Sequence, residues 1–267
     1  MKYLYPNGKQ KALTFSYDDG QKYDIRLTEI LRSHGMKGTF NLNSGTLADT
    51  AGGKYVCKKD LDKIYKGHEI AVHGVEHRNL CNITDEEISV EIMVDRQNLE
   101  HLTGKPVHGM AYAYGAYDER VIRIIGSLGV HYSRTVNENH YFEVPRNFLA
   151  WDATCHHNND LLKHGKEFLE LPEWKELPLM YVWGHSYEFG EPDDWSVIEE
   201  FTDMMQGKDD IWYATNGEIY DYITAIRRLE FTADGCFVKN PTSTDIWYRT
   251  KENAPKKIGA GEFAKII

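Results

Sequence analysis

The sequence predicts an α/β protein, a (β/α) barrel of parallel strands with a small antiparallel β extension at its C-terminus. Short apolar segments alternate with helical patterns from residue 11 to residue 229, and such alternation is typical of parallel strands joined by helices. From residue 230 onward, strand-like segments follow one another with no helical pattern between them. We therefore expect a barrel over residues 1–229 and a β extension over residues 230–267 that packs on the barrel.

Each expected barrel strand is a short apolar segment, and most are followed by a helical pattern. The expected strands are residues 11–17, 35–42, 68–74, 107–114, 130–136, 147–153, 177–185 and 211–215. The expected helices are residues 23–34, 59–66 and 118–128, together with two helices that begin after Thr84 and Thr215. At both of these threonines a glutamate follows three residues later, which is the capping box of a helix start. The extension should contribute strands within residues 230–240, 245–250 and 256–263.

Composition and charge exclude several classes of protein. The chain of 267 residues has 31 basic and 41 acidic residues, a formal charge of −10, and no block of lysine and arginine that could neutralise phosphates, so we expect no nucleic-acid partner. The four cysteines are far apart and form no Cys-x-x-Cys pair, which argues against a disulfide framework or a thiolate zinc site. No apolar run reaches the ~20 residues that span a bilayer, and the N-terminal MKYLYPNGKQ lacks the apolar core of a signal peptide. As written, the sequence predicts a cytoplasmic protein with no membrane partner, or an extracellular one if a leader has been removed.

Side chains that bind metals or move protons follow three of the expected strands. Asp18 and Asp19 follow the first strand, His73 and His77 close the third, and His185 ends the seventh. Each group alone has an ordinary explanation. Asp-Asp-Gly is a common turn sequence, and in a chain with 12 histidines many have no catalytic or metal-binding role. Since the C-terminal ends of barrel strands face the active site, the shared placement of these five residues predicts an active site there.

Together these residues suffice to hydrolyse an acyl bond with one divalent metal ion. A catalytic zinc typically takes three protein ligands and leaves one position open, and Asp19, His73 and His77 offer one carboxylate and two imidazoles. Asp18 would accept the proton of the attacking water, and a protonated His185 would donate one to the leaving amine or alkoxide. Zinc is the expected ion, and cobalt or nickel also suits such a ligand set.

The segments that carry these residues resemble the motifs of the polysaccharide deacetylases of carbohydrate esterase family four. LTFSYDDG is similar to the first motif and GHEIAVHGVEH to the second, while MAYAYGAYD, FLAWDATCHH and LMYVWGHSYEF lie where the third, fourth and fifth are expected. The resemblance covers residues 10–225 and implies a deformed barrel with about seven strands, which we adopt in place of eight. It implies the roles given above for Asp18, the three ligands and His185, and it implies that the backbone N–H of Tyr114 binds the oxyanion.

The third motif departs from the family at the residue that usually pairs with the base. Many relatives have an arginine where this chain has Ala111, which leaves Asp18 without its usual partner. Arg134, at the end of the fifth expected strand, is our candidate for a substitute.

Two aromatic residues and two histidines keep more than one interpretation. Trp151 and Trp183 each either flank the site and contact substrate or belong to the core. His156 and His157 follow the sixth strand in a polar segment and are interpreted as loop residues.

The resemblance implies a metal-dependent hydrolase that removes an acetyl group from an N-acetylated or O-acetylated carbohydrate, so the expected partner is an acetylated sugar or oligosaccharide. One alternative is an amide hydrolase that acts on small cyclic amides or ureides, against which the retained metal ligands weigh. A second is a catalytically silent carbohydrate-binding homologue, and the missing arginine is its best support. The particular substrate and the oligomeric state stay open at this stage.

Overall fold

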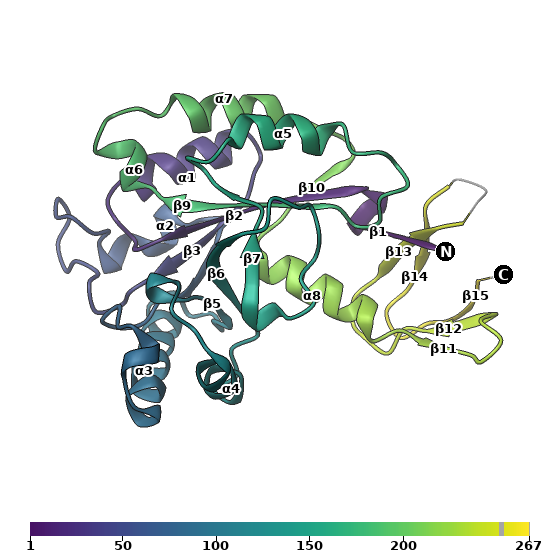
Figure 1. Cartoon of the computed structure of the whole chain (residues 1–267), viewed down its shortest axis with the longest axis horizontal. Coiled ribbons are helices and arrows are strands. Elements are labelled where there is room, and N and C mark those ends of the chain that lie inside the picture. Colours follow the sequence, from purple (N-terminus) through teal and green to yellow (C-terminus); the bar gives the residue numbers. More distant parts are fainter. Residues whose placement is uncertain (251–253, 267) are drawn as a thin grey trace.

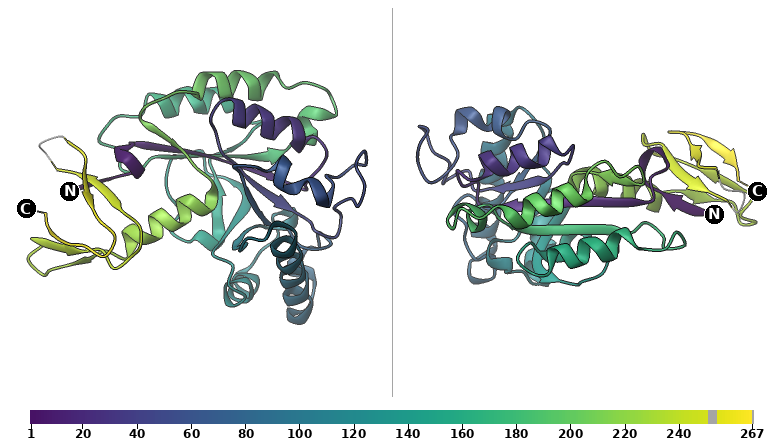
Figure 2. Two further views of the ribbon diagram at one scale, coloured as in Figure 1. Left: turned by 180° about the vertical axis from the view of Figure 1, so that it is seen from behind. Right: turned by 90° about the horizontal axis from the view of Figure 1, so that it is seen from above.

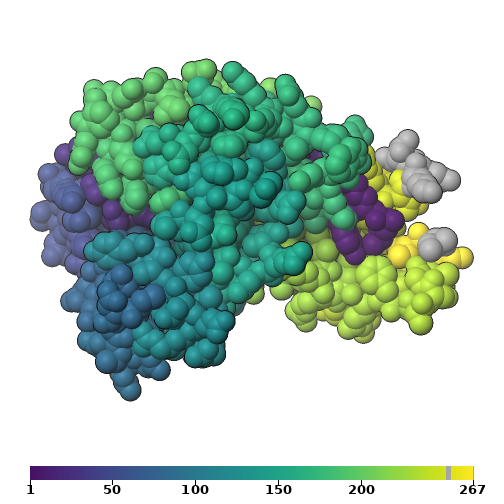
Figure 3. Space-filling model, in the orientation of Figure 1, coloured from purple at the N-terminus to yellow at the C-terminus, as the bar shows by residue number. Residues whose placement is uncertain are grey.

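The structure of the chain, a computed structural model, describes residues 1–250 and 254–266. Figure 1 shows a barrel of strands surrounded by helices, with a smaller β extension at one end where both termini lie. In the space-filling view this extension projects from the bulk of the molecule (Figure 3). Residues 251–253 and 267 of the expected extension lie outside the described residues.

The barrel strands are parallel and lie in the order β7-β6-β5-β4-β3-β2-β9-β8, with β10 paired to β2 as well. Their bounds are β2 Lys11–Asp18, β3 Thr39–Leu42, β4 Glu69–Val72, β5 Gly109–Ala111, β6 Tyr132–Glu138, β7 Trp151–Ala153, β8 Cys155–His156, β9 Leu179–His185 and β10 Ile211–Tyr213.

One extended segment closes the barrel. β7 pairs with β6, and β8, which is separated from β7 by Thr154 alone, pairs with β9 on the other side. The Thr154 N–H donates to the Tyr181 carbonyl of β9 at 2.8 Å, so the change of partner occurs without a break in hydrogen bonding. If β7 and β8 are counted as one strand position and β10 as an addition, the barrel consists of seven strand positions. This confirms the expected deformed barrel.

β2 is the central strand of the barrel. It pairs with β9 along Ala12–Asp18 on one side. On the other side its first three residues pair with β10 and its last three with β3. All eight residues of β2 are therefore buried, and Asp18 ends the strand inside the protein.

Eight α-helices are found among the described residues, and most cover the outside of the barrel (Figures 1 and 2). They are α1 Asp24–Ser33, α2 Leu61–Ile64, α3 Asp85–Thr103, α4 Glu119–Ser127, α5 Leu161–Leu169, α6 Tyr187–Gly190, α7 Ser196–Met205 and α8 Asn216–Arg227. Both predicted capping boxes form, at the starts of α3 and α8. The sequence reading missed α5 and α7, and neither has a side-chain hydrogen bond at its N-cap, so the signal that marked α3 and α8 is lacking there.

Two expected elements differ in detail. The strand expected over 147–153 begins as a 3-10 helix at Phe148–Ala150, and only Trp151–Ala153 is a strand. The helix expected over 59–66 is a 3-10 turn, Lys58–Asp60, that leads into the short α2.

The β extension consists of two three-stranded antiparallel sheets, β1-β13-β14 and β11-β12-β15. Their bounds are β1 Lys2–Leu4, β11 Glu230–Phe231, β12 Phe237–Lys239, β13 Ile246–Arg249, β14 Lys256–Ile258 and β15 Phe263–Lys265. Val238, Tyr248 and Ile258 form a small core of their own between the sheets. Tyr222 of α8 links the extension to the barrel, because its hydroxyl donates to the Leu4 carbonyl at 2.6 Å and accepts from the Trp247 N–H at 3.0 Å. None of the described helices combines the length and the apolar character that crossing a bilayer requires.

Candidate active site

The residues predicted for the active site lie at one end of the barrel because the parallel strands that carry them end there. Asp18 is the last residue of β2 and is paired in register with His185, the last residue of β9, and with Asn41 of β3. β4 ends at Val72, immediately before His73. The topology therefore brings together side chains that are more than 160 positions apart in the chain.

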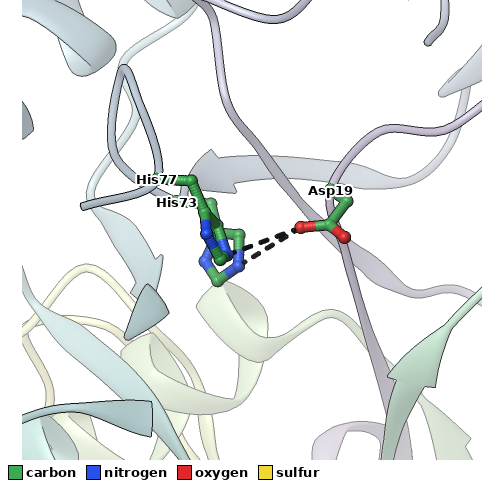
Figure 4. Close-up of side chains that lie close together, drawn as sticks. All are labelled: Asp19, His73 and His77. Atoms are coloured by element: carbon green, nitrogen blue, oxygen red, sulfur yellow. Dashed lines mark ion pairs between the residues drawn. The ribbon is translucent and has the colours of Figure 1, made fainter. Parts of the chain in front are cut away.

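Asp19, His73 and His77 converge on one point. The Nε2 atoms of His73 and His77 each lie 3.7 Å from Asp19 Oδ1. Figure 4 shows both imidazole rings facing this carboxylate. Asp19 and His77 adopt left-handed backbone conformations, with φ of 79° and 57°, which side chains other than glycine rarely adopt. Such strained positions are concentrated at functional sites.

The surroundings of His73 leave its Nε2 atom free to bind a metal. The ring Nδ1 lies 2.8 Å from the Ala111 carbonyl, which accepts its proton, so Nε2 carries the lone pair. The His73 backbone N–H donates to Asp95 Oδ2 at 3.0 Å. Burial, which outweighs the hydrogen bonds from Ser44 and His73, raises the pKa of Asp95 to about 6. One carboxylate and two imidazoles with an oriented tautomer fit a transition-metal ion such as zinc.

Asp18 is held as a charged carboxylate inside the barrel. Asn41 Nδ2 donates to Asp18 Oδ1 at 2.8 Å, and Arg134 forms an ion pair with Asp18 Oδ2. Burial alone would raise the pKa of Asp18, but the Arg134 guanidinium, with smaller contributions from His73 and His185, lowers it to about 2. The carboxylate is therefore ionised at neutral pH.

Arg134 reaches Asp18 from the strand next to the one that carries Ala111. Ala111 of β5 and Arg134 of β6 are paired in register, so the two positions lie side by side at the same height of the barrel. The guanidinium also donates to Ser16 Oγ at 3.2 Å, and it lies over the ring of Trp183, 4.3 Å from the ring centroid. An arginine on the neighbouring strand thus contacts the carboxylate that Ala111 cannot reach.

His185 lies beside a carboxylate that the sequence reading missed. Glu188, three residues further on in α6, accepts the His185 backbone N–H at 3.0 Å, and its Oε2 lies 3.4 Å from the ring Nδ1. Burial favours the neutral imidazole, but the contact with Glu188 and the charges of Asp18 and Asp19 outweigh burial and raise the pKa of His185. The spacing of His185 and Glu188 was a signal in the sequence, because side chains three apart meet when the chain turns into a helix. Asn41 was also missed, although its position near the end of the second expected strand could have indicated that it lies at the site.

Tyr114 lies at the edge of the site. Its ring is 4.5 Å from that of His77, its side chain is exposed, and its backbone has a left-handed φ of 59° within the 3-10 turn Ala113–Gly115. An open depression of about 520 Å³ lies beside the metal-binding set, lined by Glu76, His77, Arg78, Asn79, Asn82, Ile83 and Tyr114.

The two tryptophans have different positions. Trp183 is buried under Arg134, and its ring lies 5.9 Å from that of His185, so it supports the site from below. Trp151 is 1% exposed and packs edge-on against Tyr132, Phe148 and Tyr181. Of the two interpretations kept for Trp151, this enclosure favours a core residue over one that contacts substrate.

Comparisons with known proteins agree with this architecture. A family model described as polysaccharide deacetylase matches residues 5–133, a segment that includes Asp18, Asp19, His73 and His77 and ends one residue before Arg134.

Among solved structures, a putative polysaccharide deacetylase from Mycobacterium smegmatis superposes with a TM-score of 0.63 at 17% identity, covering 85% of this chain and 94% of that one. The Xyl-CE4 domain of a multidomain xylanase from the hindgut metagenome of Trinervitermes trinervoides has a TM-score of 0.55 at 14% identity, with 81% and 92% covered. A CE4 family pseudoenzyme from Bacillus anthracis has a TM-score of 0.50 at 18% identity, with 83% and 68% covered. At these identities the likeness concerns the fold.

A likeness to a curated protein has a different character. Calcium-dependent protein kinase 11 from Arabidopsis thaliana is 23% identical over 218 residues, which cover 76% of this chain and 43% of the kinase, so the chain spans less than half of that relative's length. The sequence contains no G-x-G-x-x-G, the loop with which protein kinases cover the phosphates of ATP. We therefore draw no functional argument from this likeness.

Proposed function

We propose that this chain, whose residues 5–133 match a family model described as polysaccharide deacetylase, is a metal-dependent hydrolase that removes acetyl groups from N-acetylated or O-acetylated carbohydrates. The observation that carries the proposal is the charged, buried Asp18 next to Asp19, His73 and His77. Asp18 Oδ2 is 3.8 Å from His73 Nε2, so a base lies within reach of water at the metal-binding set.

The metal requirement of the proposal rests on the donor set. Asp19, His73 and His77 would hold one divalent ion, for which zinc is the best fit and cobalt or nickel are alternatives. Such an ion, when bound, polarises a carbonyl and lowers the pKa of water. Burial and the neighbouring His73 lower the pKa of His77, which keeps its ring neutral and able to act as a ligand at neutral pH.

The remaining steps use groups of the chain itself. Asp18 accepts a proton from water as the water oxygen bonds to the acetyl carbon. The developing oxyanion accepts a hydrogen bond from the backbone N–H of Tyr114. A donor of this kind typically lowers the activation barrier by about 3 kcal/mol. His185, whose raised pKa favours the protonated ring, donates to the leaving nitrogen or oxygen as the bond to the acetyl carbon breaks. The products are acetate and the free amine or hydroxyl of the sugar.

The ion pair between Arg134 and Asp18 supports an active enzyme over a silent homologue. The CE4 neighbour from Bacillus anthracis is described as a pseudoenzyme, so the fold by itself does not guarantee activity. In this chain the base has a cationic partner despite Ala111, and the base, the three ligands and the acid are all present.

Acetate release measured on a substrate panel tests the proposal. The panel contains N-acetylglucosamine oligomers, O-acetylated xylo-oligosaccharides and cyclic amides such as hydantoin, and the protein is assayed before chelation, after exhaustive chelation and after zinc is restored. We expect acetate from a carbohydrate, loss of activity on chelation and its recovery with zinc. Asp18→Asn should be inactive, whereas Asp203→Asn, on the outer surface, should match wild type. Full activity after chelation would refute the metal mechanism, and turnover of cyclic amides alone would refute the substrate class.

A further inference from the structure

A second set of side chains of the kinds that bind metals adjoins His185 through Glu188. It consists of His156, the last residue of β8, His157, which follows it, and Glu188 of α6, and we call it the second cluster. Glu188 Oε2 lies 3.1 Å from His156 Nε2 and 3.2 Å from His157 Nε2. One donor atom from each of the three residues lies within 4.8 Å of the others, and the cluster shares no residue with the Asp19, His73 and His77 set.

His157 lacks a hydrogen-bond partner although it is fully buried. Its side chain is 0% exposed, and neither ring nitrogen has a partner among the described residues. Its Nε2 approaches the Glu188 carboxylate at 3.2 Å, but the ring is not turned so that an N–H points at the oxygen. Buried polar groups are nearly always partnered, so an imidazole in this position requires an explanation. An ion between the nitrogen and the oxygen would partner both atoms.

The distances in the second cluster suit a small metal ion. Ligand atoms about 2.0–2.1 Å from a tetrahedral zinc lie about 3.3 Å from one another. The two nitrogen-to-oxygen distances of 3.1 and 3.2 Å are close to this value. The corresponding distances from Asp19 to its two histidines are longer, 3.7 Å.

The His157 ring is held firmly by its neighbours. Gly184 of β9 approaches so closely that a Cβ added there would lie 2.1 Å from His157 Nδ1. The ring also stacks on Tyr17, with 5.7 Å between centroids and 19° between planes, and lies 4.1 Å from the ring of Phe189. This packing holds the ring in place with its Nε2 3.2 Å from Glu188 Oε2, and a preorganised ligand is the condition for a well-defined metal site.

His156 would have to exchange one hydrogen bond for a metal bond. Its Nδ1 accepts the Asn158 backbone N–H at 3.1 Å, which places the ring proton on Nε2. Coordination through Nε2 moves this proton to Nδ1 and breaks the bond to Asn158. Asn158 is exposed, so water can replace the lost partner of its N–H.

We propose that the second cluster binds a second divalent ion of the zinc class, with His156 Nε2, His157 Nε2 and Glu188 Oε2 as ligands and a fourth position open to water. Two imidazoles and one carboxylate are a donor set that zinc accepts readily. Because Glu188 also contacts His185, an ion here would lie beside the proposed acid without replacing the first ion.

The number of zinc ions bound per chain tests this proposal. Wild type and variants are stripped of metal, equilibrated with micromolar free Zn²⁺ and analysed for bound zinc by mass spectrometry. We expect two equivalents in wild type, one in His77→Gln, one in His156→Gln and one in Glu188→Gln. His34→Gln is the matched control, since His34 is also half-buried and 3.1 Å from a carboxylate, that of Asp203, but belongs to no metal-binding group among the described residues. It should bind two equivalents.

The result that overturns the proposal is a single equivalent in wild type that His77→Gln removes, or two equivalents that persist in both His156→Gln and Glu188→Gln. Circular dichroism of each variant checks that it is folded, and if Glu188→Gln fails to fold, His156→Gln decides alone. Bound zinc is counted without any substrate. A protein that binds two equivalents but releases no acetate would therefore refute the proposed function and leave the second site standing.

Discussion

Replacing Arg134 by methionine removes the guanidinium that neutralises Asp18 inside the barrel. The pKa of Asp18 falls from 3.8 to about 2, and since one pKa unit corresponds to 1.36 kcal/mol, the folded protein favours the carboxylate by ~2.5 kcal/mol at neutral pH. Burial opposes this charge, so the arginine contributes more than the net value. Because breaking a buried ion pair typically costs about 3–5 kcal/mol, we expect Arg134→Met to lower the free energy of unfolding by that amount at neutral pH.

The pH dependence of this loss has a defined sign. In wild type, the stability that Asp18 contributes is present above 3.8, its ordinary pKa, and is lost as the pH falls through about 2. Without Arg134, burial dominates and raises the Asp18 pKa above 3.8. The difference in free energy of unfolding between wild type and the variant should therefore shrink as the pH falls through that raised pKa. Urea unfolding at neutral and at mildly acidic pH measures both effects.

A double-mutant cycle separates this ion pair from a general loss of packing. Asp18→Asn combined with Arg134→Met should be more stable than Arg134→Met alone, because the double variant buries no unpaired carboxylate. Arg26→Met is the control, since Arg26 pairs with Asp193 and Glu199 on the surface and should cost no more than about 1 kcal/mol. The reasoning is refuted if Arg134→Met is as stable as the control, or if the second substitution restores nothing.

Three further outcomes follow from the site. Asn41→Leu leaves Asp18 Oδ1 without its 2.8 Å donor and should cost about 1–3 kcal/mol in urea unfolding, whereas a cost below that of an exposed substitution would show that water replaces the amide. In wild type, kcat/KM should fall as the pH rises through a value above 6.5, because His185 loses its proton at its raised pKa. His185→Gln should lower kcat by about 10²–10⁴-fold and abolish this fall of kcat/KM at alkaline pH. If the fall is unchanged in the variant, His185 is not the acid. Tyr114→Gly keeps the backbone N–H and relieves the left-handed φ of 59°, so kcat should stay near wild type, and a loss as large as that of His185→Gln would assign the function to the phenol ring.

The sequence was sufficient to predict the residues that lie at the ends of regular strands. Asp18, Asp19, His73 and His185 follow strongly apolar segments, and parallel strands bring their ends together whatever the intervening loops do. Arg134 could be named as a candidate because its strand comes next along the chain after the one that carries Ala111, although it is the third residue of β6 and does not end that strand.

Contacts set by packing between distant segments could not be predicted in this way. Trp151 sits on a strand that changes its pairing partner at Thr154, and no local pattern tells whether its side chain points into the core. The approach of Glu188 to His156 and His157 depends on Gly184 and the course of α6, so these histidines read as loop residues. β1 pairs with β13, which lies far away along the chain, and a strand as short as β1 has no sequence periodicity from which this pairing could be predicted.

The position of β2 between β9 and β10 affects the order in which the chain can fold during synthesis. β2 is made early, but its partners β9 and β10 begin at Leu179 and Ile211. About 160 residues separate the end of β2 from β9, and at a synthesis rate of 5–20 residues per second the ribosome needs roughly 8–30 s to bridge them. Through this interval an apolar strand has a free edge, which is the template on which other chains aggregate. A nascent chain of this design therefore depends on protection of its first barrel strand until β9 and β10 have emerged.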